Sequence, residues 1–227
     1  MARRKTGQPL WAAVDQYLGD VFAPSDEQLD AALKANRKAG LPAIDVSPLQ
    51  GKFLQVLVQM TQAKRVLEIG LLGGYSTIWM ARALPRGGRI VSLEFNPKHA
   101  EAARANLKRA GLLRRVDVRV GPALESLPVL ASERGAKFDL IFIDADRANN
   151  PPYLDWALKL SRRGSVIVVD NIVRQGNVIE AKSADPDIRG TRRCLEMMAA
   201  YPRLNAFAMQ TVGLKGLDGF ALAVVVK

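Results

Sequence analysis

The pattern that most constrains the fold begins at Arg65, where short apolar runs start to alternate with segments of helical periodicity. Each run is apolar along almost its whole length, which is typical of a strand buried on both faces of a sheet. Such strands, when helices separate them, form a parallel sheet that helices cover on both sides. The sequence therefore predicts an α/β fold with strands at residues 65–69, 89–94, 116–120, 138–144 and 165–170.

Two further strand-like runs follow, at residues 205–211 and 219–226. Only residues 212–218 separate them, and a parallel pair needs a longer crossover connection than that. We therefore expect the last two strands to form an antiparallel hairpin beside a mostly parallel sheet. This arrangement differs from a dinucleotide-binding fold, which is built from two equal βαβ halves.

The region before the first strand, residues 1–62, has helical patterns and is predicted to be an N-terminal helical segment ahead of an α/β core at 63–227. Ser25 begins a capping box for its second helix. Ser47, which a proline follows, is predicted to cap the third helix. We find no repeat, low-complexity tract or linker, so residues 1–227 are expected to form a single domain.

The net charge of +11 is compatible with a nucleic acid, a membrane surface or an acidic small molecule as partner. However, basic residues are mixed with acidic ones along the chain, and the aromatic fraction of 6% offers few side chains for stacking on bases. We therefore favour solvated surface charge over the alternative of a nucleic-acid-binding module. No apolar run reaches the roughly 18 residues that a membrane span needs. The single cysteine, Cys194, excludes an internal disulfide and favours the cytoplasm.

A glycine-rich turn at Gly70, Gly73 and Gly74 follows the first strand. Glycine lets the backbone approach a ligand closely, and the next helix points N–H groups at it. This spacing is not the G-x-G-x-x-G pattern of a nicotinamide-dependent oxidoreductase, which is the alternative enzyme class. Glu68 precedes the turn, where an acid can balance a cationic ligand. Glu94 ends the second strand and is placed to accept both ribose hydroxyls of a nucleoside cofactor; its alternative role is a charge at a helix start.

Polar side chains also follow the fourth and fifth strands, with Asp144 after the fourth and Asp170 and Asn171 after the fifth. The carboxyl ends of parallel strands meet at one edge of a sheet, so we expect these three side chains to converge. Carboxylate and amide oxygens suit a hard cation, with Mg²⁺ favoured over Mn²⁺ or Ca²⁺. Structural capping by the Asp170–Asn171 pair is the alternative.

Taken together, these motifs resemble the metal-dependent catechol and caffeoyl-CoA O-methyltransferase family, particularly its bacterial members. The resemblance is carried by residues 46–51 (VSPLQG), 66–70 (VLEIG), 73–77 (GGYST), 142–146 (FIDAD), 169–171 (VDN) and 218–220 (DGF). It implies a methyltransferase-type, Rossmann-like sheet, S-adenosylmethionine (SAM) as methyl donor, and a homodimer. It implies metal ligation by Asp144, Asp170 and Asn171. The implied cofactor contacts are Val46, Glu68, Gly70, Ser76, Glu94, Ala123 and Asp144.

The expected reaction is methylation of a small phenolic acceptor, either catechol-like or hydroxycinnamoyl. A divalent ion would lower the pKa of one hydroxyl, and the resulting oxyanion would attack the methyl group of SAM. Asp144 and Arg147 are the expected catalytic residues. Relatives commonly have a lysine, a candidate base, at the position of Arg147. Arginine stays protonated, so the metal alone suffices, water takes the proton, or Arg147 binds an acidic part of the acceptor. We expect His99 at the surface and residues 172–190 over the acceptor.

Overall fold

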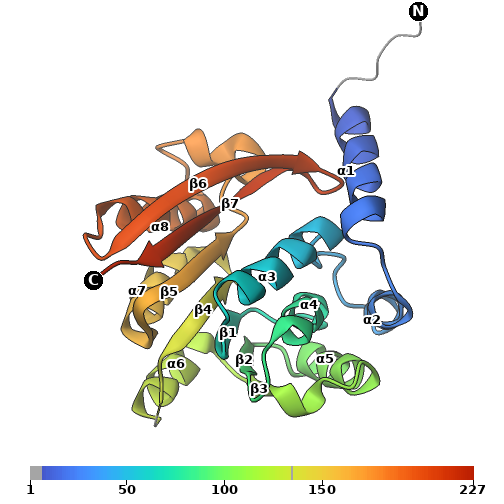
Figure 1. Ribbon diagram of the computed structural model, residues 1–227. Helices are drawn as coiled ribbons and strands as arrows, with labels where there is room; N and C mark the ends of the chain where they lie inside the picture. The colour runs from blue at the N-terminus through green and yellow to red at the C-terminus, as the bar shows by residue number, and fades with distance from the viewer. Residues whose placement is uncertain (1–6, 134) are drawn as a thin grey trace, which may run out of the picture.

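A seven-stranded sheet forms the centre of the computed structural model, which describes residues 7–133 and 135–227 (Figure 1). The first six residues of the predicted helical segment lie outside this described part. The strand order is β3-β2-β1-β4-β5-β7-β6. Strands β1 to β5 are parallel, and β7 is antiparallel to β5 and to β6, which confirms the predicted fold class. The strands are β1 Arg65–Ile69, β2 Arg89–Glu94, β3 Val116–Val120, β4 Phe138–Ile143, β5 Ser161–Asp170, β6 Leu204–Gly213 and β7 Gly216–Val225.

Helices cover both faces of this sheet and form a separate apolar core on each face (Figure 1). Successive strand residues point to opposite faces, so Val66 packs in one core and Leu67 in the other. Helices α2 Glu27–Lys38, α3 Pro48–Met60, α4 Tyr75–Ala83 and α5 Pro97–Arg109 pack on the first face, and α6 Ala123–Ser132, α7 Asn150–Leu160 and α8 Pro186–Ala200 on the second. Short 3₁₀ helices lie at Leu113–Arg115, Arg147–Asn149 and Arg174–Ile179.

The hairpin is longer than the sequence indicates. Pairing continues to Gly213 opposite Gly216, so Leu214 and Lys215 alone form the turn. Strand β5 likewise begins at Ser161, four residues before the predicted start at 165, across a register shift opposite β4. Polar residues occupy both extensions, which is why an apolar pattern does not reveal them.

The N-terminal helices are present as expected, with one corrected cap. Asp26, rather than Ser25, caps α2, because its carboxylate accepts hydrogen bonds from the backbone N–H groups of Gln28 and Leu29. Ser47 caps α3 as predicted, by accepting from the N–H of Gln50.

The first helix, α1 Gln8–Phe22, has no buried residue and lies beside the turn of the hairpin (Figure 1). Its Gln8 Nε2 donates to the carbonyl oxygen of Gly213 at 3.0 Å. The backbone N–H of Leu214 donates to Asp15 Oδ2 at 2.8 Å. Helix α1 is therefore attached to the body through polar contacts with the hairpin, and several of its apolar side chains face solvent.

Candidate active site

A cavity of about 1140 Å³ opens at the carboxyl ends of β1, β2, β4 and β5. The strand order reverses between β1 and β4, and ligands bind at this kind of switch point in open α/β sheets. The volume is sufficient for a nucleoside cofactor together with a small acceptor.

The glycine turn forms one wall of the cavity, and its shape requires glycine at two positions. Gly70 has a φ of +97°, and a Cβ atom there would collide with the backbone of Asp144. A Cβ atom on Gly73 would collide with the side-chain amide of Asn36. Because neither position has a side chain, the end of β4 and helix α2 can both pack closely against the turn.

Asn36 and Asn106 connect this turn to another part of the cavity wall. Both are buried, at 2% and 1% exposure. Asn106 Nδ2 donates to the carbonyl oxygen of Gly73 and to Asn36 Oδ1, and Asn36 Nδ2 donates to Asp45 Oδ1, each at 2.9 Å. Asp45 lines the cavity, so this chain of hydrogen bonds connects its loop to the glycine turn through α2 and α5. No sequence motif indicates the pair.

Glu94 lies at the cavity wall and organises the turn beside it. One carboxylate oxygen accepts hydrogen bonds from the N–H groups of Leu71 at 3.1 Å and Leu72 at 2.8 Å, and the other accepts from the N–H of Asn96 at 2.9 Å. The cap of α5 is the side chain of Asn96, which accepts from the N–H of Lys98. Glu94 therefore serves the turn and not the start of α5.

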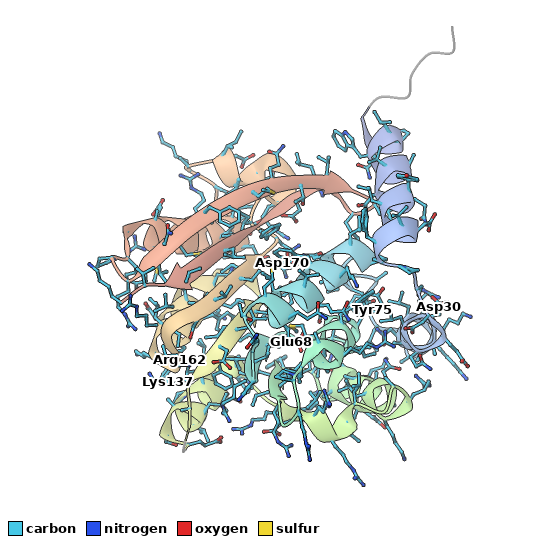
Figure 2. All side chains as sticks on the ribbon, in the orientation of Figure 1. Asp30, Glu68, Tyr75, Lys137, Arg162 and Asp170 are labelled. Atoms are coloured by element: carbon cyan, nitrogen blue, oxygen red, sulfur yellow. The ribbon has the colours of Figure 1, made fainter. Side chains whose placement is uncertain are left out.

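The position of Glu68 differs from the expectation of a direct ligand contact. Its carboxyl is completely buried beneath the cavity and accepts hydrogen bonds from the hydroxyls of Ser76, Thr77 and Ser92, each at 2.6 Å (Figure 2). Burial raises its pKa to about 7. Since Ser76 does line the cavity, Glu68 is placed to orient Ser76 and not to touch a ligand itself.

The remaining predicted cofactor residues all lie on the cavity lining. Val46 comes from the loop before α3 and Ala123 from the start of α6. His99, expected at the surface, also lines the cavity, and its Nδ1 lies 3.4 Å from Glu94 Oε1. The loop Asn96–Pro97 that precedes His99 turns α5 back toward the strand end, which explains this difference.

Asp144, Asp170 and Asn171 converge at the same cavity, as the sequence predicts for neighbouring strand ends. Asp170 Oδ1 accepts from the N–H of Asn171 at 2.7 Å, and Asp170 Oδ2 accepts from Gln50 Nε2 at 2.5 Å. Asn171 has a φ of +53°, a strained conformation for a residue with a side chain. Gln50 belongs to the 46–51 motif and is a site residue that the sequence reasoning missed.

The two carboxyl groups perturb one another. Burial raises the pKa of Asp170 well above its ordinary value, and the charge of Asp144 raises it further. Burial also raises the pKa of Asp144, against the opposing charge of Arg147. An additional cation here would relieve this repulsion, and all three side chains offer oxygen donors, so the set fits a hard divalent ion. Within the described residues, no group of three His, Cys, Asp or Glu side chains is arranged as a metal site, because the third donor here is an amide.

The roof of the cavity differs from the prediction for residues 172–190. Of that segment only Arg174 lines the cavity. The hairpin contributes Thr211, Gly213 and Lys215 among others, and α1 contributes Asp15. The hairpin reaches the site because β7 pairs with β5, whose end carries Asp170.

Comparison with known proteins identifies the family. A model described as "O-methyltransferase" matches residues 21–224. A catechol O-methyltransferase of Mycobacterium tuberculosis is 56% identical over 218 residues, 96% of this chain and 97% of that protein. The solved O-methyltransferase of Bacillus cereus in complex with SAH is 58% identical, with a TM-score of 0.94 over 96% of this chain and 99% of that one. TomG from Streptomyces achromogenes, solved in complex with SAM, is 45% identical, with a TM-score of 0.95 over 98% of this chain and 100% of that one.

The chain therefore belongs to the O-methyltransferase family and is a SAM-dependent O-methyltransferase. The resemblance inferred from the motifs is confirmed. This class replaces the oxidoreductase and nucleic-acid-binding alternatives. In the part of the chain that the structure describes, no helix has the length and apolar character of a membrane span.

Proposed function

We propose that this enzyme methylates one hydroxyl of a small acceptor with neighbouring hydroxyls, catechol-like or hydroxycinnamoyl, and that it requires a divalent cation. The observation that carries the proposal is that Asp144, Asp170 and Asn171 meet in the same cavity as the glycine turn. A donor molecule, a cation and an acceptor can therefore occupy one enclosed space. The name of the catechol O-methyltransferase relative supports the acceptor class.

The cofactor half of the site is assigned to residues around the glycine turn. Glu94 is assigned to the ribose hydroxyls, because its carboxylate lies at the cavity and is fixed by three backbone N–H groups. Glu68 positions Ser76 and Thr77 through hydrogen bonds. The other residues assigned to SAM are Val46, Gly70, Ser76, Ala123 and Asp144.

The metal half is assigned to Asp144, Asp170 and Asn171, with Mg²⁺ as the proposed ion and Mn²⁺ or Ca²⁺ as other hard cations that suit oxygen donors. When bound, such an ion supplies positive charge that favours the ionised form of an acceptor hydroxyl. Gln50 holds one oxygen of Asp170 and leaves the carboxylate in a defined orientation. Asp144 lies between the two halves, because its backbone packs against Gly70.

Arg147 is assigned a charge role and not the role of a base. Its guanidinium lines the cavity 3.2 Å from Asp144 Oδ1. Arginine stays protonated at every pH at which the enzyme works. A fixed cation here stabilises negative charge that develops on the acceptor.

A panel of acceptors tests this function. Catechols, hydroxycinnamates and their CoA esters should be incubated with the enzyme, SAM and Mg²⁺, and the products measured by mass spectrometry. We expect a mass shift of one methyl group with at least one acceptor that has neighbouring hydroxyls, and none with the matching monohydroxy compounds. Equal turnover of the monohydroxy compounds would contradict the requirement for two oxygens.

We also propose that the enzyme is a cytoplasmic homodimer. Apolar side chains are exposed on α1 and on the edge strand β6, including Tyr17 at 67%, Phe22 at 61% and Met209 at 51%, and patches of this kind mark interfaces. The free thiol of Cys194 suits a reducing compartment. Sedimentation velocity should give twice the 24.8 kDa of one chain. A monomer at all concentrations tested would contradict the homodimer.

A further inference from the structure

The guanidinium of Arg147 lies among the oxygens that we assign to the metal. Its Nη2 donates to Asp144 Oδ1 at 3.2 Å and also to Asn171 Oδ1. Its Nη1 donates to the carbonyl oxygen of Ala145 at 2.7 Å, which fixes the fork in this position. Two of the three proposed ligands therefore already face a positive charge that belongs to the chain.

The other cationic side chains on the cavity lining have different partners. Lys215 Nζ donates to the carbonyl oxygen of Ala43 at 3.3 Å. Arg174 pairs with Asp187 at 3.7 Å. His99 faces Glu94 at 3.4 Å. Within the described residues, Arg147 is thus the cation that contacts the proposed ligands.

Two cations cannot share these oxygens without cost. A lone pair that accepts from a guanidinium is less available to a metal, and two positive charges a few ångströms apart repel strongly in a partly buried site. Arginine makes this competition stronger than lysine does, because its planar fork contacts two acceptors at once.

We propose that Arg147 is an internal counter-cation that competes with the divalent ion for Asp144 and Asn171, and that metal binding displaces its guanidinium. This inference rests on the proposed metal site. It predicts that the enzyme without substrates binds a divalent ion more weakly than it would with a neutral side chain at position 147.

The test is Mn²⁺ binding to chelator-treated protein in the absence of SAM and acceptor, measured by calorimetry and by the EPR signal of free Mn²⁺. Arg147→Met removes the charge and the fork but keeps an unbranched side chain. We expect the Mn²⁺ dissociation constant of Arg147→Met to be at least fivefold lower than that of the unmodified enzyme. Arg147→Gln, also neutral, serves as a second variant if the methionine variant does not fold.

Two controls make the result specific. Lys215→Met removes a cation from the same cavity without touching the proposed ligands, so its Mn²⁺ affinity should match that of the unmodified enzyme. Arg147→Met combined with Asp170→Ala should lose the tight binding, because the site itself is then broken.

The proposal is overturned if Arg147→Met changes the dissociation constant less than fivefold or weakens binding. It is also overturned if Lys215→Met tightens binding as much as Arg147→Met does, since the effect would then be general to the cavity. Binding that is equal in all variants leaves the metal site intact and removes only the role of Arg147. No Mn²⁺ binding to any variant would contradict the metal site and this inference together.

Discussion

Replacing Glu94 with alanine tests the cofactor half of the site. The carboxylate contacts the N–H groups of Leu71, Leu72 and Asn96, so both of its oxygens are held in place before any ligand arrives. A carboxylate fixed in this way can accept hydrogen bonds from two ribose hydroxyls with little further ordering. Glu94→Ala removes those acceptors and leaves the backbone of the turn unsupported.

The expected magnitude follows from the charge. A hydrogen bond to a charged group contributes about 1.5–3 kcal/mol, and about 1.4 kcal/mol corresponds to tenfold in affinity. We therefore expect SAM affinity to fall at least tenfold. The buried N–H of Leu71 also loses its acceptor, so the free energy of unfolding should fall by about 1–3 kcal/mol.

Calorimetric titration with SAM and chemical unfolding measure these two quantities separately. Asn96→Ala is the matched control, because it removes the cap of α5 beside Glu94 and leaves the carboxylate in place. It should lower stability by about 1 kcal/mol without changing SAM affinity. An unchanged dissociation constant in Glu94→Ala, or an equal loss in Asn96→Ala, would refute the assignment of Glu94 to the ribose.

Four further predictions follow from other parts of the structure. Asp170→Ala should abolish turnover but change SAM affinity less than threefold by calorimetry, because Asp170 is assigned to the metal alone. Arg147→Ala should slow turnover without moving the rising limb of the pH–rate profile; a displaced limb would mean that residue 147 transfers a proton. The pKa of Glu68 is raised from 4.5 to about 7 in the folded protein, so the free energy of unfolding should fall, relative to Glu68→Gln, as the pH rises from 4.5 to 7. As a single domain, the chain should unfold in one transition by circular dichroism and calorimetry; two separated transitions would contradict this.

Much of the fold is predictable from local patterns. The strands β1, β2 and β3 have the predicted bounds because each is a short run between glycine or polar segments. The hairpin follows from the length of its connection alone. Strand ends are less certain where polar residues pair, as at Ser161 and Gly213, because only the pairing strand reveals them.

The site is predictable where it depends on strand ends and less so where it depends on packing. Asp144 and Asp170 meet because parallel strands end at one edge of the sheet. The burial of Glu68 depends on hydroxyls from α4 and β2 that meet only in the folded chain. The contact of Gln50 with Asp170 spans 120 residues, and no local pattern indicates such a pairing.

The most direct test of the account is the dependence of methyl transfer on a divalent ion. Enzyme treated with a chelator and verified to be metal-free by elemental analysis should be assayed with SAM and a catechol acceptor. The account predicts that turnover is lost and that added Mg²⁺ or Mn²⁺ restores it, while SAM affinity changes little. Full turnover by the verified metal-free enzyme would contradict the proposed role of Asp144, Asp170 and Asn171.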